Sequence, residues 1–163
     1  MTHLPGWIDK VYFVHNILSE QTVVFRLEPL KGNDRTLEHE FSVYKKLNKG
    51  TGIPLALYFG TESGFNVMAI DGLSPSLEDL FVRSGFQFTI RTVLPLARQL
   101  VSIIDFWSHN SQVNLFYVQL CRLQYIHSCN YIHCDLKPSN VVMGVSNQAN
   151  LVYLIDFELS KEY

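Results

Sequence analysis

The sequence predicts an α+β fold in which a half rich in antiparallel strands is followed by a half rich in helices. Residues 11–18 and 22–30 are dominated by β-branched, aromatic and aliphatic side chains, and the polar tripeptide Ser-Glu-Gln between them predicts a turn. Residues 51–70 predict a second pair of strands around the turn TESG. Elsewhere apolar residues recur at three-and-four spacing, which indicates amphipathic helices.

The first helix is predicted over residues 37–50, after a polar loop at residues 31–36. Gly50 supplies a stop signal for this helix. A second helix is predicted after residue 75, because Ser76 followed three residues later by Asp79 resembles a capping box with the shorter acid. The apolar face of the first helix has spacings of four, three and three, at Leu37, Phe41, Tyr44 and Leu47.

The composition limits the classes of protein to which this chain can belong. A chain of 163 residues with 47% hydrophobic content can bury the core of one ordinary domain. The net charge of −2 gives no electrostatic reason to expect nucleic acid, and no apolar run approaches the roughly 20 residues of a membrane-spanning helix. Three cysteines cannot all pair and no secretory leader opens the chain, so we expect an intracellular protein of the cytoplasm or nucleus.

A dense polar cluster follows the apolar pair at the start of residues 131–140, which are YIHCDLKPSN. Asp135, Lys137 and Asn140 fall at spacings of two and three, and Pro138 keeps this segment in a shaped loop. An acid, a base and an amide in one rigid loop suit a hydroxyl, a phosphate and a magnesium ion. Asp156 ends a second apolar run, and a strand there that pairs back on the loop would complete a metal site.

These segments resemble known protein kinases. The loop resembles the catalytic loop H-R-D-x-K-x-x-N, and IDFE resembles the D-F-G segment. More narrowly, TGIP, GLSPSLEDLF, YIHS, NVVMG and the final NLVYLIDFELSKEY resemble the casein kinase I family, in order, between about residues 11 and 163. The alternative is an unrelated soluble α/β domain with a chance His-x-Asp, but several separate segments that agree in spacing favour the family.

The resemblance implies a protein-kinase-like fold and a serine/threonine kinase activity. The antiparallel-sheet small lobe would span residues 1–73, and an incomplete helical large lobe would span residues 74–163. The activity would transfer the γ-phosphoryl group of ATP to Ser or Thr hydroxyls of protein substrates with the help of Mg²⁺. The chain ends seven residues after Asp156, where the family continues through an activation segment, so we expect only the first part of the large lobe.

The resemblance also implies a role for individual residues. Asp135 would orient the substrate hydroxyl, Lys137 would contact the transferred phosphate, and Asn140 and Asp156 would hold Mg²⁺. His133 would pack under the loop and Phe157 behind it. The nucleotide site would comprise Arg26 at the position of the phosphate-binding lysine, its partner Glu40, the gatekeeper Ile70, the hinge residues Asp71 and Leu73, and the adenine-pocket residues Val11, Val24, Val142 and Ile155.

Several positions depart from the family pattern and predict impaired turnover. Gly6 is the one glycine where a glycine-rich phosphate loop is expected. Arg26 keeps a charge but not the shape of lysine, Cys134 replaces an arginine, and Glu158 replaces the glycine of D-F-G. A catalytically inactive pseudokinase that acts as a binding module is therefore an alternative, and so is a degenerate gene product.

Three residue-level alternatives accompany these roles. Arg26 could be an ordinary surface arginine on an edge strand, and Glu40 could be a solvated helix carboxylate. A cluster of histidines and cysteines could suggest zinc, but its spacing is not one of the usual paired-ligand spacings, and the kinase loop already accounts for the histidines. The residues of that cluster are His127, Cys129, His133 and Cys134.

Residues 101–119 interrupt a helical pattern with an apolar segment that carries one formal charge, Asp105. Without them, three-and-four spacing continues from Val93 through Leu100 and Leu120 to Ile126 as one helix that matches the family without a gap. The hypothesis is a translated, unspliced intron, because nineteen codons preserve the frame and its ends can be encoded by GTAAGT and CAG. The alternative is a genuine insertion.

Overall fold

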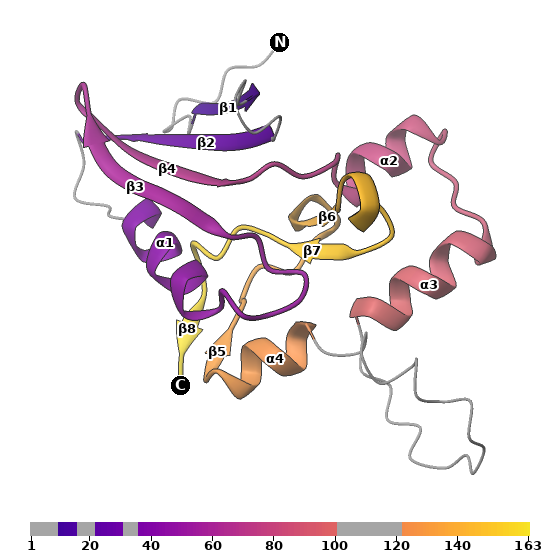
Figure 1. Cartoon of the computed structure of the whole chain (residues 1–163). Helices are drawn as coiled ribbons and strands as arrows, with labels where there is room; N and C mark the ends of the chain where they lie inside the picture. Colours follow the sequence, from indigo (N-terminus) through magenta and orange to yellow (C-terminus); the bar gives the residue numbers. More distant parts are fainter. Residues whose placement is uncertain (1–9, 16–21, 31–35, 101–121) are drawn as a thin grey trace.

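The computed structural model describes residues 10–15, 22–30, 36–100 and 122–163. A four-stranded antiparallel sheet occupies the first half of this described chain (Figure 1). Its strands are β1 (Lys10–His15), β2 (Thr22–Pro29), β3 (Ala56–Glu62) and β4 (Phe65–Asp71), in the order β1-β2-β4-β3. The predictions for Gly6, the turn at residues 19–21, most of the polar loop at residues 31–36, and residues 101–119 lie outside the described residues.

The register of the sheet determines which side chains share a face. Val11 lies opposite Arg26, Phe13 lies opposite Val24, and Val24 in turn lies opposite Ile70. Directly opposite residues point to the same side of a sheet, and so do residues two positions apart on a strand, so these five side chains share one face. This face therefore presents apolar side chains and one arginine together.

The β3–β4 turn and helix α1 follow local sequence signals. The predicted turn TESG is confirmed: Ser63 and Gly64 both have positive φ, as a tight hairpin connection requires. Helix α1 (Thr36–Lys46) begins where the carboxylate of Glu28 accepts hydrogen bonds from the Thr36 and Leu37 amides, at 3.2 and 3.3 Å. It ends four residues before Gly50, which packs against the ring of Tyr125.

The described residues of the second half form three α-helices, two short 3-10 helices (Pro138–Asn140 and Ser146–Gln148) and two small sheets. The α-helices are α2 (Leu77–Arg83), α3 (Ile90–Leu100) and α4 (Arg122–Ser128). The capping box at the start of α2 is confirmed, because the Asp79 amide donates to Ser76 Oγ and the Ser76 amide donates to Asp79 Oδ2, both at 3.1 Å. One small sheet joins β5 (Tyr131–Ile132) to β8 (Lys161–Glu162), and the other joins β6 (Val141–Met143) to β7 (Val152–Leu154).

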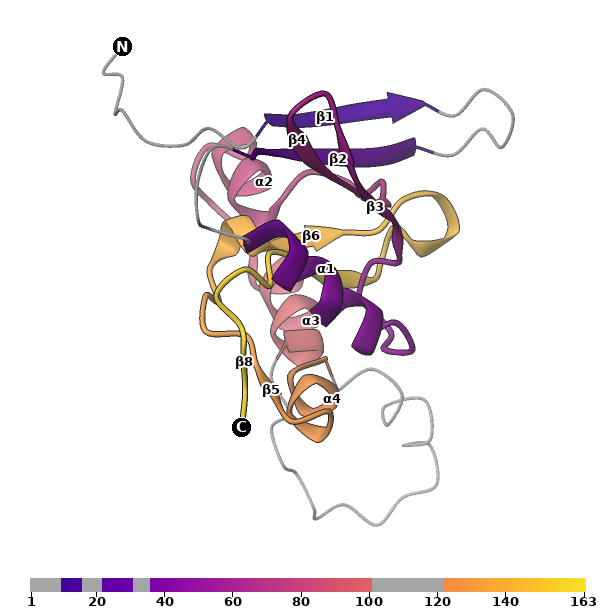
Figure 2. The ribbon, with the colours of Figure 1, turned by 90° about the vertical axis from the view of Figure 1, so that its left-hand side faces the viewer.

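Helix α1 packs between the sheet and the second half (Figures 1 and 2). Tyr44 of α1 and Leu47, the residue after the helix, are fully buried and belong to one core cluster with Met68 of β4 and with Ile126 and Phe157 of the second half. The rings of Tyr44 and Phe157 meet edge to face, with centroids 5.1 Å apart. The predicted α+β arrangement of an antiparallel sheet with one helix, followed by a partial helical part, is thus confirmed.

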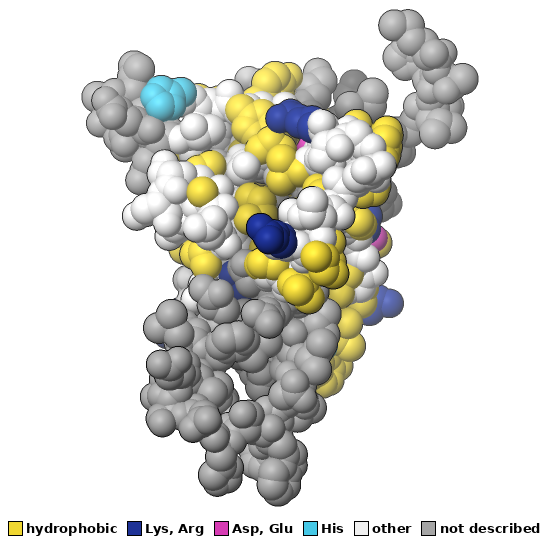
Figure 3. Space-filling model, turned by 90° about the vertical axis from the view of Figure 1, so that its right-hand side faces the viewer, with side chains coloured by type: hydrophobic (Ala, Val, Ile, Leu, Met, Phe, Trp, Pro, Cys, Tyr) yellow, Lys and Arg dark blue, Asp and Glu magenta, His cyan; other side chains and the backbone are white. Residues whose placement is uncertain are grey.

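Helices α2 and α3 expose hydrophobic side chains on the side of the molecule shown in Figure 3. Phe86 and Ile90 are about two-thirds exposed, at 65% and 67%, and Val93 and Leu94 are also exposed. None of the helices among the described residues has the length and apolar character needed to cross a membrane. Two parts of the helix predicted between residues 93 and 126 are described, as α3 and α4. The residues between them lie outside the described part, so the continuous helix stays a prediction.

Candidate functional site

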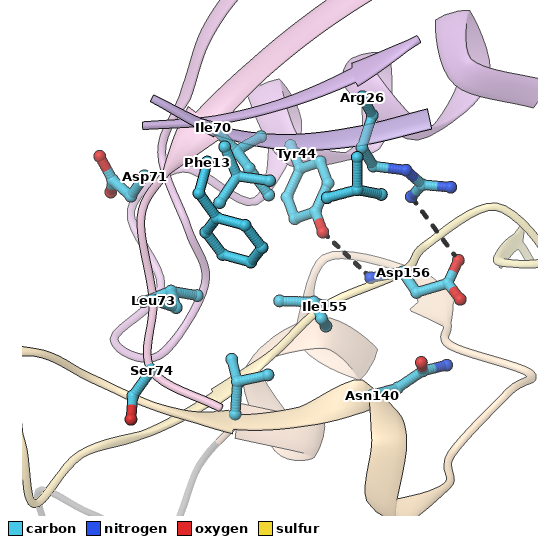
Figure 4. A pocket seen from close by; sticks show the side chains of 13 residues that line it. Phe13, Arg26, Tyr44, Ile70, Asp71, Leu73, Ser74, Asn140, Ile155 and Asp156 are labelled. Carbon is cyan, nitrogen blue, oxygen red and sulfur yellow. Dashed lines mark hydrogen bonds and ion pairs between the residues drawn. The ribbon is translucent and has the colours of Figure 1, made fainter. Parts of the chain in front are cut away.

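A cavity of about 300 Å³ lies between the sheet and the second half (Figure 4). This volume is at the lower end of the range of about 300–1,000 Å³ that is usual for small-molecule sites. Both halves contribute to its wall, and charged side chains gather at one end. The lining residues are Val11, Phe13, Val24, Arg26, Tyr44, Ile70, Asp71, Leu73, Ser74, Asn140, Val142, Ile155 and Asp156.

The apolar part of the cavity brings together the predicted adenine-pocket residues. Val24 and Ile70 come from neighbouring strands of the sheet, whereas Val142 and Ile155 come from the second half. Strand β6, which carries Val142, pairs with β7 just before Ile155, so the predicted strand that returns to the loop is confirmed. Two walls far apart in the sequence therefore face each other.

Phe13 is a lining residue that the sequence analysis missed. Its ring points into the cavity between Ile70 and Leu73 in Figure 4. The available signal was the period-2 pattern of β1, since a residue two positions after Val11 must share its face. Tyr44 and Ser74, which also line the cavity, were not predicted as site residues either.

The segment that joins the two halves is held by backbone hydrogen bonds. The Asp71 amide donates to Leu55 O at 3.1 Å, and the Gly72 amide donates to Thr22 O at 2.9 Å. A Cβ at Gly72 would collide with Thr22, so glycine permits the close approach of this segment to β2. Asp71 and Leu73, the predicted hinge residues, both reach the cavity wall.

Arg26 is the centre of the charged end. Its Nη1 contacts Glu40 Oε2 and lies 4.0 Å from Asp156 Oδ1, while its Nη2 lies 3.9 Å from Glu158 Oε2. The side chain of Arg26 is 15% exposed and that of Glu40 is 1% exposed. The expected ion pair is therefore present, and the alternatives of a surface arginine and a solvated helix carboxylate are wrong.

Burial dominates the protonation of Glu40. Loss of hydration raises the pKa of Glu40 from 4.5 to about 7, because the opposing attraction of Arg26 is smaller and the charge of Asp156 adds to the rise. Near neutral pH this carboxyl group is thus divided between its neutral and ionised forms. Its ionised form depends on the adjacent guanidinium.

The polar loop is arranged around Asp135. Lys137 Nζ donates to Asp135 Oδ2 at 2.6 Å, and Asn140 Nδ2 donates to the same oxygen at 3.0 Å. These contacts, with that of Lys137 the larger, lower the pKa of Asp135, so the carboxylate is ionised at neutral pH. Asp135 does not line the cavity itself, but its partner Asn140 does.

His133 supports this loop from below, as predicted. It is 1% exposed, its ring lies 4.7 Å from that of Phe157, and its Nε2 lies 3.0 Å from Ile155 O. The Asp135 amide donates to His133 Nδ1 at 3.3 Å, so Nε2 carries the proton that Ile155 O accepts. Burial lowers the pKa of His133, which favours this neutral form.

Asp156 is held in the left-handed region, with φ of 69°. Its amide donates to Tyr44 Oη at 3.0 Å, and the preceding Ile155 amide donates to Asn140 O at 3.0 Å. These bonds place Asn140 and Asp156 on the same cavity wall (Figure 4). Carboxylate and amide oxygens are ligands that Mg²⁺ accepts when phosphate oxygens and water complete its shell, so the donor set fits this ion.

Asn140 uses its amide nitrogen for Asp135, which leaves its amide oxygen as the atom that could coordinate a cation. Within the described ranges, no group of three or more histidine, cysteine, aspartate or glutamate side chains is arranged to hold a metal ion. A cation here would therefore depend on oxygens of a bound ligand.

The chain also matches a known protein family. A family model described as protein kinase domain matches residues 30–163. The matched part begins just after β2 and runs through α1 and the cavity wall of the second half to β8, whereas β1 and β2, which carries Arg26, precede it. The match and the sheet together confirm the protein-kinase-like fold that the sequence predicted.

Proposed function

This chain belongs to the protein kinase family, and on that basis we propose that it is a casein kinase I-type serine/threonine kinase domain with a retained ATP cleft and impaired phosphoryl transfer. The observation that carries the proposal is the cavity between the two halves, with apolar walls and with Asn140 and Asp156 at its polar end. We assign the small lobe to residues 1–73 and the partial large lobe to residues 74–163. The casein kinase I assignment rests on the segments TGIP, GLSPSLEDLF and NVVMG.

In this proposal the adenine ring lies between Val24 and Ile70 on one side and Val142 and Ile155 on the other. Mg²⁺, held by Asn140 and Asp156, would neutralise charge on the ATP phosphates. Asp135, which its contacts keep ionised, accepts a hydrogen bond from a Ser or Thr hydroxyl and orients it. Lys137, within 2.6 Å of that carboxylate, supplies a cation beside the transferred group.

Two features support impaired transfer. Arg26 already faces Glu40, Asp156 and Glu158, so a phosphate must compete with three carboxylates for its guanidinium. Glu158 also adds a negative side chain next to the position of the phosphates, where like charges repel. The same two features favour the second candidate, a pseudokinase that binds a partner or nucleotide without turnover.

Phosphate transfer from radiolabelled ATP to a Ser/Thr peptide library tests the proposal. We expect the unmodified chain to remain near background and the Arg26→Lys/Glu158→Gly variant to rise above it, because the variant restores a lysine and removes a carboxylate. Adding Asp135→Asn should return the double variant to background. Transfer by the unmodified chain equal to that of the double variant would contradict the claim of impairment, and an inactive double variant that still binds ATP would favour the pseudokinase.

We also propose that residues 101–119 are a retained intron or an insertion. The support is that α3 and α4 flank this segment and have apolar faces that continue each other's spacing when it is left out. Sequencing of the transcript distinguishes the two origins. A message population that always retains these nineteen codons would reject the intron.

A further inference from the structure

Three carboxylates surround Arg26 at the polar end of the cavity; Asp156 lines the cavity itself, whereas Glu40 and Glu158 reach it through the guanidinium. Glu40, Asp156 and Glu158 all lie within 4.0 Å of the Arg26 guanidinium. Lys137 is the second cation whose charge reaches Asp156 and Glu158, but its ammonium group is already held by Asp135 at 2.6 Å. Among the residues that the structure describes, negative groups therefore outnumber positive groups at this end even when Glu40 is protonated.

The other end of the cavity is mostly apolar, and the carboxylate of Asp71, which also lines the cavity, accepts a hydrogen bond from the Leu55 amide at 2.9 Å. Valine, isoleucine and leucine side chains line it, and the Phe13 ring points into it (Figure 4). A flat, uncharged ring system gains from burial against such walls without having to displace an ion pair. The two ends thus make opposite demands on a ligand that carries both a base and phosphates.

A triphosphate group meets a specific obstacle here. To bind it, the Arg26 guanidinium must leave at least one of its carboxylates, and the freed carboxylate then faces the added negative charge. Mg²⁺ reduces this repulsion, but ATP with one Mg²⁺ ion bound is still an anion. A nucleoside, which has no phosphates, requires neither the loss of an Arg26 ion pair nor the approach of like charges, and it keeps its contacts with the apolar walls.

We propose that this cleft binds a nucleoside in preference to a nucleoside triphosphate, and that Glu158 is the residue that sets the preference. The inference rests on the nucleotide cleft of the proposed function and specifies its ligand class. We choose Glu158 as the determinant because its side chain is 35% exposed and its carboxylate lies 3.9 Å from Arg26 Nη2. Glu40, by contrast, is buried under Arg26.

Isothermal titration calorimetry with adenosine, ATP and ATP with Mg²⁺ tests this preference on the full chain. We expect the unmodified chain to bind adenosine at least as tightly as ATP with Mg²⁺. Glu158→Gln should tighten ATP binding about tenfold, the effect of removing one like charge worth about 1.4 kcal/mol, and change adenosine binding less than about twofold. Glu62→Gln, which removes an exposed carboxylate at the β3–β4 turn, should change neither affinity.

The outcomes separate this inference from the proposed function. Tenfold tighter binding of ATP with Mg²⁺ than of adenosine by the unmodified chain would overturn the preference while leaving an ATP cleft in place. Equal tightening of both ligands by Glu158→Gln, or by a second variant Glu158→Ser, would overturn the role of Glu158. No binding of either ligand by a chain with a folded circular dichroism spectrum would overturn the proposed function and the preference together.

Discussion

Replacement of Arg26 by methionine should destabilise the protein in a strongly pH-dependent way. The guanidinium contacts Glu40, whose side chain is 1% exposed, and it is the nearest cation to that carboxylate among the described ion pairs. Methionine keeps much of the apolar stem of arginine but removes the charge. Without the guanidinium charge, we expect the buried carboxyl group of Glu40 to stay protonated over the accessible pH range.

The magnitude follows from the pKa of Glu40, which is about 7 in the folded protein. Below pH 7 this group already carries its proton, so loss of the guanidinium costs little through Glu40. Above pH 7 ionisation of Glu40 stops the loss of stability with rising pH in the unmodified protein, whereas the variant continues to lose stability, so the difference grows by about 1.4 kcal/mol for each further pH unit. The additional cost is therefore near zero at pH 5 and about 3 kcal/mol at pH 9. This cost stays below that of an unpaired buried carboxylate, because Glu40 takes up a proton when the guanidinium is removed.

Urea unfolding followed by far-ultraviolet circular dichroism at pH 5 and pH 9 measures this cost. The Glu40→Gln variant is the matched control, because in that background Arg26→Met should have the same effect at both pH values. The sign can be checked independently. Since the pKa of Glu40 is raised on folding, its contribution to the free energy of unfolding should decrease between pH 4.5 and pH 7. An Arg26→Met cost that is equal at pH 5 and pH 9 would refute the reasoning.

Three further predictions concern stability in the same unfolding assay. Phe157→Ala should cost about 3–5 kcal/mol, because the ring is fully buried against Tyr44; a loss below 1 kcal/mol would contradict this packing. Ser76→Ala should cost about 1 kcal/mol by removing the cap of α2, whereas Ser76→Thr, which keeps the hydroxyl that Asp79 accepts from, should retain most of that stability. Cys134→Gly should stabilise by up to about 1 kcal/mol, because φ at Cys134 is 64°; Cys129, which does not have positive φ, should lose stability on the same change.

Local signals in the sequence were sufficient for most of the elements. The β3–β4 turn and the cap of α2 depend on residues within four positions of each other, so their geometry is decided by neighbouring side chains and backbone preferences. The loop around Asp135 is similar, because Pro138 and the short spacing to Asn140 restrict it whatever lies around it. These features could be predicted without any knowledge of packing.

The end of α1 was placed less well. The sequence predicts a stop at Gly50, but the helix ends at Lys46, and Gly50 packs against the ring of Tyr125 from the second half. The two small sheets of the second half were also predicted only in part. Their strands are two or three residues long, and such short segments acquire strand geometry from their partners rather than from their own composition.

The sequence by itself determined the order of the elements and the chemistry of the polar loop, because both are encoded in residues that lie close together along the chain. Only the tertiary structure decided the charges around the cavity. Arg26 and Glu158 come from the two ends of the chain, and their approach to 3.9 Å depends on how α1 and Phe157 pack between the halves. The same packing buries Glu40 and raises its pKa, since loss of hydration is a property of the surroundings and not of the residue.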